Sequence, residues 1–355
     1  MRTYHRRYCA WGAISERIFN LTDPNSQLIA AALARLGLGQ ATDIRGIQQL
    51  VGGVSSDIWQ IDLGGRSICA KRALPTLKVA AHWQAPLSRN AFEYAWYQTI
   101  APAFPELVPA MLGRDAPSGI FFMQYLAPEH YPVWKTLLLQ GRIDTGMAQQ
   151  VGQALGQVHA FTAGKPNIAK VFESDAEFFS LRLEPYLLAT ANLHPALQNK
   201  LSSLCEATAN TKKCLVHGDV SPKNILCGPT SPVFLDAECA WYGDPAFDLA
   251  FCLNHLLLKA VHQPAQSAEL LAAFDSMAGA YLAQVNWEPS ASLQARAAGL
   301  LPALLLARVD GKSPVEYLTN PVARQQVRDI AIPCLQTSFE QLDAVRLTAQ
   351  DVLKP

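Results

Sequence analysis

One short segment of the sequence, residues 214–251, constrains the fold more than any other part of the chain. It contains two short apolar runs with β propensity, residues 225–227 and 233–235, separated by Gly, Pro, Thr and Ser residues that favour a turn. These runs predict an antiparallel hairpin. In such a hairpin the residue before the first strand lies beside the residue after the second, so we expect Asn224 and Asp236 to be cross-strand neighbours.

The chemistry at the open end of this hairpin indicates a metal site. Asn224 and Asp236 offer hard oxygen ligands, which Mg²⁺ accepts while it keeps water molecules and substrate phosphates in its other positions. Asp219 lies in the loop that leads into the hairpin, where its carboxylate can reach a substrate hydroxyl. Phosphoryl transfer needs metal ions that neutralise the moving phosphate and one base that orients the nucleophile. The segment therefore predicts a phosphoryl-transfer site.

The same segment carries the motifs of a known family. Residues 217–224, HGDVSPKN, have the spacing of the kinase catalytic loop H-R-D-x-x-x-x-N, with glycine in place of arginine. The triplet at residues 236–238, DAE, and the run at residues 243–249, GDPAFDL, follow in the same order as in that family. On these motifs the chain resembles the aminoglycoside phosphotransferase and choline kinase superfamily of small-molecule kinases, and it is similar to the methylthioribose kinase branch.

The resemblance implies a fold class and a set of roles. The fold expected is α+β and protein-kinase-like, with two lobes: an N-lobe of antiparallel sheet with helices and a mainly helical C-lobe. Asp219 is then the base or orienter of the attacking hydroxyl, and Asn224 and Asp236 are the Mg²⁺ ligands. We place His217 in the catalytic set as a residue that holds the loop by hydrogen bonds. Glu238 either binds the metal or supports a group that does.

A second part of the sequence, upstream of the catalytic loop, predicts the sheet of the N-lobe. Three strand-like runs at residues 46–51, 58–63 and 67–73 form a predicted meander of hairpins. The turn after the first run contains Gly52, Gly53 and Ser55, and the resemblance implies that this turn covers the phosphates of ATP. By themselves the two glycines are also explained as a hairpin turn that needs positive φ.

Lys71 lies in the third run, on the face that strand alternation assigns to Cys69, Lys71 and Ala73. The resemblance implies that Lys71 pairs with Glu93 in a helix predicted at residues 88–99. The alternative for Glu93 is a surface charge that pairs with Arg89 one turn away.

The last strand predicted in this half, at residues 120–126, leads into a hinge. The resemblance implies that the backbone around Gln124 and Leu126 meets the adenine of ATP. Main-chain recognition of this kind leaves no side-chain signature.

The acceptor is expected to be a small molecule with a hydroxyl group. Only a few residues separate Asp236 from the helix predicted near Asp244, which leaves no activation loop on which a protein substrate could dock. Four residues are candidates for acceptor contacts: Trp241, Arg308, Asp310 and Lys312. Trp241 either stacks on the acceptor or packs in the core, and the cations also suit the end of a helix.

Composition sets the outer limits. The 355 residues divide by resemblance into a weakly ordered tail at 1–24, an N-lobe at 25–127 and a C-lobe at 128–355. Lys+Arg and Asp+Glu both number 29, so bulk charge indicates neither a nucleic-acid partner nor an anionic membrane. The eight cysteines form no Cys-x-x-Cys pair and are typical of free thiols in the cytoplasm, where we expect the protein. The sequence leaves the choice between monomer and homodimer open.

The activity expected is therefore MgATP-dependent phosphorylation of a small-molecule hydroxyl. A non-catalytic nucleotide-binding scaffold is the alternative, supported by the relaxed glycine turn and by Ser221, which stands where protein kinases have a lysine. A metal-dependent phosphohydrolase that uses the same carboxylates is a third possibility, and it explains the order of the motifs less well.

Overall fold

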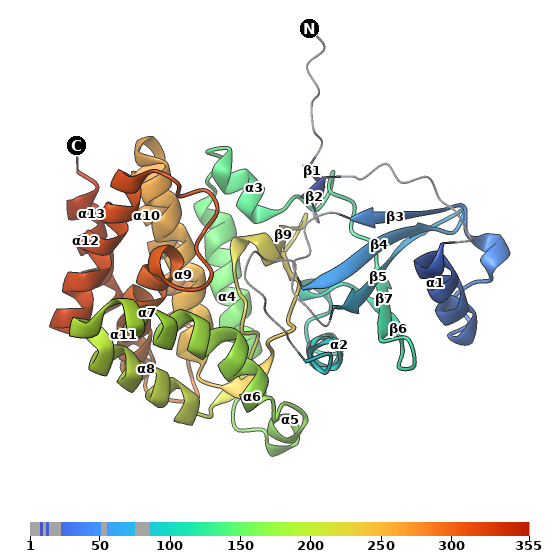
Figure 1. The fold of residues 1–355 in the computed structure, drawn as a ribbon, viewed down its shortest axis with the longest axis horizontal. Helices are drawn as coiled ribbons and strands as arrows, with labels where there is room; N and C mark the ends of the chain where they lie inside the picture. Colours follow the sequence, from blue (N-terminus) through green and yellow to red (C-terminus); the bar gives the residue numbers. More distant parts are fainter. Residues whose placement is uncertain (1–7, 10–11, 14–22, 51–54, 75–85, 355) are drawn as a thin grey trace, which may run out of the picture. The chain divides into compact units, whose positions relative to one another are not determined.

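The computed structural model describes residues 8–9, 12–13, 23–50, 55–74 and 86–354 (Figure 1). The chain forms two compact units. The first consists of Met1–Val133, Leu226–Pro229 and Val233–Leu235, and the second consists of Trp134–Ile225, Thr230–Pro232 and Asp236–Pro355. Gly52 and Gly53, and most of the tail expected at residues 1–24, lie outside the described residues.

The first unit is built on a five-stranded antiparallel sheet with the strand order β3-β4-β5-β7-β6. Its three predicted strands are present as β3, β4 and β5. The elements of this unit are β1 (Tyr8–Cys9), β2 (Gly12–Ala13), α1 (Pro24–Arg35), η1 (Ala41–Asp43), β3 (Gly46–Leu50), β4 (Ser56–Asp62), β5 (Ser67–Ala73), α2 (Arg89–Ile100), η2 (Pro105–Leu107), β6 (Met111–Asp115) and β7 (Ile120–Gln124).

The two faces of this sheet carry different side chains because successive residues of a strand point to opposite sides. Ala70 and Phe122 are directly paired across β5 and β7, and both belong to the core cluster that α1 shares through Ile29 and Leu33. Lys71 and Phe121 are the next pair and therefore face the other way. The residues of α2 cover that second face, as described for the site below.

The second unit is mainly helical (Figure 1). Its long helices α4, α9 and α10 pack against one another, and α11 packs against α9 and α12. The elements of this unit are α3 (Trp134–Leu139), α4 (Thr145–Thr162), α5 (Pro166–Val171), α6 (Asp175–Phe178), the π-helix η3 (Phe179–Leu188), α7 (Ala189–Leu193), η4 (Pro195–Leu197), α8 (Gln198–Asn210), β8 (Cys214–Val216), η5 (Pro222–Asn224), β11 (Trp241–Gly243), α9 (Pro245–His262), η6 (Pro264–Gln266), α10 (Ser267–Leu282), α11 (Ser290–Asp310), α12 (Pro321–Thr337) and α13 (Leu342–Val352).

Helix α11 is the one helix in the described part of the chain that has the length and composition needed to cross a membrane. In the structure, 61% of its most apolar window is buried inside the protein. The central helix of a helical bundle has the same character, because it is apolar on every side that its neighbours cover.

The predicted hairpin is present as β9 (Ile225–Cys227) paired with β10 (Pro232–Phe234). Leu226 and Val233 pack in a small apolar cluster with Leu126 and Val133. A second short ladder joins β8 to β11, with Val216 opposite Trp241. These two ladders fix both ends of the loop that carries the HGD motif, because the loop leaves β8 and enters β9.

Candidate functional site

The loop that begins at His217 is held by one buried carboxylate from α9. Asp248 accepts hydrogen bonds from the backbone N–H of His217 through Oδ2, at 2.7 Å, and from that of Gly218 through Oδ1, at 2.9 Å. The side chain of His217 adds a third bond, because its Nδ1 accepts from the backbone N–H of Asp219 at 3.2 Å. The prediction that His217 holds the loop by hydrogen bonds agrees with this geometry.

Gly218 explains why the kinase arginine is replaced by glycine in this motif. Its φ of +77° lies in the left-handed region, and a Cβ at this position would lie 2.4 Å from the carbonyl oxygen of Cys239. Any side chain would therefore displace the loop from the backbone that follows the hairpin.

Asp219 is the most heavily coordinated carboxylate of the loop. Its Oδ2 accepts a hydrogen bond from Asn224 Nδ2 at 2.9 Å and one from Lys223 Nζ at 3.0 Å, and it lies 3.1 Å from Arg182 Nη2. Its Oδ1 accepts no hydrogen bond from a described residue. One oxygen is thus fixed by three donors, and the other is left to receive a hydrogen bond from a ligand.

The electrostatics keep Asp219 ionised. Burial acts to raise the pKa of its carboxyl group, since only 4% of the residue is exposed. The positive charges of Arg182 and Lys223 outweigh this effect, so the pKa of Asp219 lies below its ordinary value. An ionised carboxylate in a fixed orientation is what a base or orienter of a hydroxyl requires.

Asp236 follows the hairpin and adopts a backbone conformation that is rare outside glycine, with φ at +66°. Its Oδ2 lies 3.9 Å from Lys223 Nζ, so Lys223 bridges the carboxylates of Asp219 and Asp236. Strained backbone of this kind is concentrated at functional sites, where the surrounding structure compensates for its cost.

The residues present suit Mg²⁺. Asn224 donates through Nδ2 to both the backbone and the side chain of Asp219, so its Oδ1 atom remains available to a cation. Asp236 contributes a carboxylate that is 17% exposed, and Glu238, which is 8% exposed, is close enough to Arg182 for their charges to interact. The described residues contain no cluster of three His, Cys, Asp or Glu side chains that could hold a metal. Mg²⁺ needs none, because it takes most of its ligands from water and phosphate. The metal roles of these residues stay predictions.

Two residues of this site were missed by sequence reasoning. Lys223 had a signal, because it stands four residues after Asp219 in the same loop. Arg182 had none: it comes from the π-helix η3, and its Nε donates to the carbonyl oxygen of Gly218 while Nη2 meets Asp219. Arg182 therefore fixes both the loop backbone and the carboxylate.

In the first unit, Lys71 Nζ donates to Glu93 Oε1 at 2.7 Å, as the resemblance implied. Both side chains are almost fully buried, at 0% and 1% exposed, and the hydroxyl of Tyr97 also donates to Glu93 Oε1 at 3.0 Å. Lys71 reaches Glu93 because strand alternation aims it at the face that α2 covers. A buried ion pair with additional hydrogen bonds holds the lysine in one position.

The remaining nucleotide candidates have structural partners. The carbonyl oxygen of Ser55 accepts from Arg89 Nη2 at 2.6 Å, and the backbone N–H of Gln124 donates to the carbonyl oxygen of Ala110 at 2.8 Å. Leu126 is buried in the apolar cluster of the hairpin. Their contacts with ATP stay predictions.

Trp241 packs in the interior, which is the second of the two alternatives given by the sequence. Its indole ring stacks on Phe178 with ring centroids 4.2 Å apart, and its Nε1–H donates to Asp175 at 2.9 Å. A ring that is 1% exposed offers no face to an acceptor.

The three other acceptor candidates differ in how far their charges are already balanced. Asp310 receives two hydrogen bonds from Arg328, at 2.9 and 2.7 Å, and Lys312 donates to Glu184 at 2.6 Å. These two residues are engaged in local ion pairs. Arg308 is only 9% exposed and has no carboxylate within 4.0 Å among the described residues.

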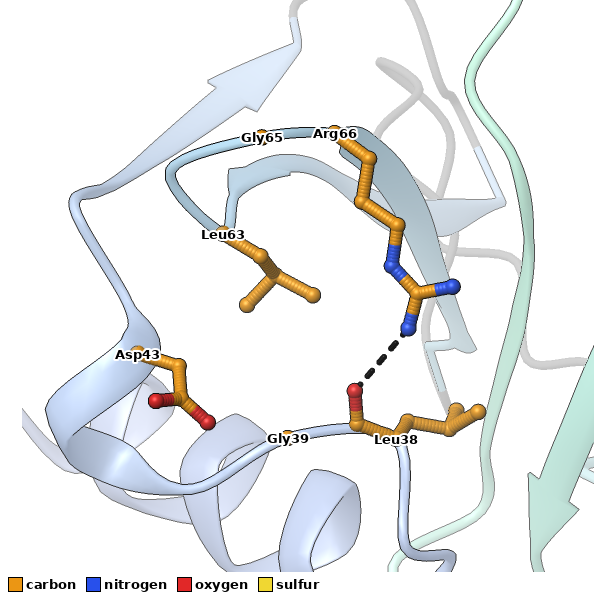
Figure 2. Close-up of a pocket in the computed structure, with 6 residues that line it drawn as sticks. All are labelled: Leu38, Gly39, Asp43, Leu63, Gly65 and Arg66. Carbon is orange, nitrogen blue, oxygen red and sulfur yellow. Dashed lines mark hydrogen bonds between the residues drawn. The ribbon is translucent and has the colours of Figure 1, made fainter.

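A surface cavity of about 320 Å³ lies in the first unit, and none of the six residues that line it is a candidate residue (Figure 2). Two of its polar side chains bond to the local backbone. Arg66 Nη2 donates to the carbonyl oxygen of Leu38 at 3.0 Å, and Asp43 Oδ2 accepts from the backbone N–H of Gln40 at 2.7 Å.

The arrangement described above is that of a protein-kinase-like phosphotransferase fold, and solved structures agree. A choline/ethanolamine kinase family protein from Mesorhizobium loti matches with a TM-score of 0.53 and 15% identity, covering 90% of this chain and 99% of that one. Spectinomycin phosphotransferase, solved in complex with ADP and spectinomycin, matches with a TM-score of 0.50 and 12% identity, covering 91% of this chain and 98% of that one. The predicted fold class is confirmed.

The chain belongs to the phosphotransferase enzyme family, whose sequence profile matches residues 46–291. Methylthioribose kinase from Bacillus cereus (strain ZK / E33L) is 24% identical over 240 residues, and the same enzyme from Bacillus thuringiensis (strain Al Hakam) is 23% identical. These matches cover 60% of this chain and 61% of each relative. The predicted superfamily is thereby confirmed.

Proposed function

We propose that this protein transfers the γ-phosphoryl group of MgATP to a hydroxyl group of a small molecule. The observation that carries the proposal is the carboxylate of Asp219, whose Oδ2 is held by Asn224, Lys223 and Arg182 while Oδ1 is left open. Methylthioribose kinases among the relatives, and a neighbouring structure solved with ADP, support the same reaction class.

In this mechanism Asp219 Oδ1 accepts the hydrogen bond of the attacking hydroxyl and then its proton. The oxygen of that hydroxyl forms the new bond to phosphorus as the bond to ADP breaks. Asn224 and Asp236 would hold Mg²⁺, which when bound neutralises charge on the phosphate groups. Lys223, which lies 3.0 Å from Asp219 and 3.9 Å from Asp236, supplies a further positive charge that a transferring phosphate can use. Lys223 can thus supply the charge of the protein-kinase lysine, whose position in this chain is occupied by Ser221.

The segment after the site supports a small acceptor. Residue 245 already begins helix α9, nine residues after Asp236, and β11 takes up three residues of the interval. A protein substrate would need an extended loop in this interval as a docking platform.

The test is ADP release from MgATP across thiosugars, sugars, amino alcohols, homoserine and aminoglycosides. Asp219→Asn should lower turnover of any accepted compound by roughly 10²–10⁴-fold, because the base is lost while its shape is kept. Asp351→Asn, which changes a carboxylate that is 70% exposed, is the matched control and should keep full turnover. Equal turnover in wild type and Asp219→Asn would remove Asp219 from the mechanism.

The competing functions give different results in the same assay. A nucleotide-binding scaffold would bind ATP and release no ADP with any acceptor. A phosphohydrolase would release phosphate from phosphomonoesters without ATP.

A further inference from the structure

Three basic side chains are buried in the second unit, and among the described residues no carboxylate lies within 4.0 Å of two of them, Lys259 and Arg308. Lys259 and His255 come from α9, and Arg308 comes from the end of α11. Their residues are 1%, 7% and 9% exposed. Lys135, on α3, and Tyr317 complete what we call the basic cluster.

Lys259 and Arg308 carry N–H donors for which no described residue is an acceptor. Lys259 donates one hydrogen bond to a described residue, from Nζ to the carbonyl oxygen of His255 at 3.4 Å, and no described carboxylate lies within 4.0 Å of it. Arg308 donates through Nη1 to the hydroxyl of Tyr186 at 3.1 Å and to Ser313 Oγ at 2.9 Å. Its Nε is buried without a partner, and no described residue accepts from its Nη2. The Nε–Nη2 edge of arginine is the one that grips two oxygens of a carboxylate or phosphate.

Tyr317 adds a third unused donor. Its hydroxyl group is buried and has no hydrogen-bond partner. Its ring lies 5.3 Å from Lys259 Nζ and 5.9 Å from Lys135 Nζ. Glu316 forms an ion pair with Lys135 and also acts on Lys259 and Arg308 from a longer distance, so one carboxylate faces three positive charges.

Burial and the neighbouring positive charges lower the pKa values of His255 and Lys259. Burial, followed by the charges of Arg308 and Lys259, holds the pKa of His255 well below its ordinary value. Burial and the charge of Lys135 lower the pKa of Lys259 to about 7. A buried, unpaired cation is costly for a folded protein and is retained where a ligand supplies the opposite charge.

A continuous series of contacts joins the basic cluster to Asp219. Arg182, which meets Asp219, lies over the ring of Phe251 at 5.9 Å, and Phe251 lies 5.5 Å from the ring of His255. Asp248, Phe251, His255 and Lys259 share one face of α9 by their spacing of three and four residues. The helix rise puts Lys259 about 16 Å beyond Asp248 along the axis, and its side chain leans back toward the helix N-terminus.

We propose that the basic cluster binds an oxyanion group, a carboxylate or a phosphate, of the same molecule whose hydroxyl group Asp219 orients. Arg308 grips two of its oxygens through Nε and Nη2, Lys259 neutralises its charge and the hydroxyl of Tyr317 donates to it. The acceptor is thus an acidic alcohol or a phosphorylated polyol, and a cationic alcohol is repelled. This inference rests on the proposed function, because it takes Asp219 as the residue that orients the hydroxyl group of the acceptor.

The test measures binding by calorimetry at constant ionic strength, with glycerol, glycerate and glycerol 3-phosphate as probes. Wild type should bind at least one of the two anions about tenfold more tightly than glycerol, because charge-assisted hydrogen bonds replace water at the cluster. Tighter binding of glycerate would identify the oxyanion as a carboxylate, and tighter binding of glycerol 3-phosphate would identify it as a phosphate. Arg308→Met and Lys259→Met should lose this preference, whereas Lys170→Met, which changes an exposed lysine, should keep it.

Tyr317→Phe tests the cluster in a variant that is expected to fold normally, because it removes one unpartnered hydroxyl group and no structural hydrogen bond. It should weaken binding of the anion a few-fold and leave unfolding unchanged. The inference is overturned if neither anion binds more tightly than glycerol, or if the variants of the cluster keep the preference. A failure of the proposed function is seen separately, as absent ADP release that does not depend on Asp219.

Discussion

The two carboxylate oxygens of Asp219 have different roles in the site. Asn224, Lys223 and Arg182 all direct donors at Oδ2 of Asp219, which orients the carboxylate and leaves Oδ1 for a substrate hydroxyl. The positive charges of Arg182 and Lys223 keep the pKa of the group below its ordinary value against the effect of burial. A carboxylate in this position can be fixed and reactive at once, because its two oxygens have separate tasks.

Lys259 is the residue for which function and stability are expected to conflict. Its pKa is about 7 in the folded protein against 10.5 as the ordinary value, so between these values the unfolded chain binds a proton that the native state lacks. Native stability therefore rises with pH across that window, and the cost of the lysine is greatest at and below pH 7. The groups that act on it are Lys135, Cys252, Glu316 and Arg308, together with the adjacent neutral His255.

Lys259→Met should therefore stabilise the protein, and the gain should be larger at pH 7 than at pH 9. The gain in the free energy of unfolding of Lys259→Met over wild type is expected to fall by up to roughly 1.4 kcal/mol per pH unit as the wild-type lysine loses its proton. Urea unfolding at the two pH values measures it. Lys170→Met should show no such pH dependence, and an equal gain at both pH values for Lys259→Met would contradict the buried charge.

At the scale of elements, the contact between α4 and α10 depends on two glycines one turn apart. A Cβ on Gly152 would lie 2.2 Å from the carbonyl oxygen of Met277, and one on Gly156 would lie 2.7 Å from Gln284 Cβ. The helices approach so closely that backbone fills the space where a side chain would stand. This packing positions His159, which lies 2.8 Å from the hydroxyl of Tyr281 and 3.3 Å from Asp248 Oδ2.

Gly152→Ala should destabilise the protein by about 1–3 kcal/mol, because the methyl group must push the two backbones apart. Gly279→Ala is the matched control in α10, since a Cβ there meets no atom within 4 Å. It should stabilise the helix by roughly 0.5–1 kcal/mol. Thermal unfolding of both variants tests the pair, and a neutral Gly152→Ala would show that the helices are free to separate.

At the scale of the whole molecule, the chain forms two compact units. The core of the first unit is the sheet with α1, and the second unit is held by packing among its helices. Because a chain of two compact units often violates two-state behaviour, we expect calorimetric unfolding to depart from a single two-state transition.

Two variants assign the transitions. Lys71→Met should lower the midpoint of one transition, since it leaves the buried charge of Glu93 without its ion-pair partner. Gly152→Ala should lower the midpoint of the other. A single sharp transition that both variants shift equally would show that the units unfold as one.

The sequence by itself determined the parts of the site that are local along the chain. The hairpin and the HGD loop follow from spacing within residues 214–251, because turn chemistry and strand pairing act over a few residues. Alternation along β5 assigned Lys71 to one face of the sheet, and the family resemblance supplied Glu93 as its partner.

Only the tertiary structure decided the contacts between distant helices. Arg182 reaches Asp219 from the π-helix η3, and Trp241 is buried against Phe178. The basic cluster brings Arg308 from α11 to Lys259 on α9, and no local pattern relates these positions. The physical reason is that such contacts depend on how helices pack, which a periodic pattern of apolar residues constrains only to a face and not to a partner.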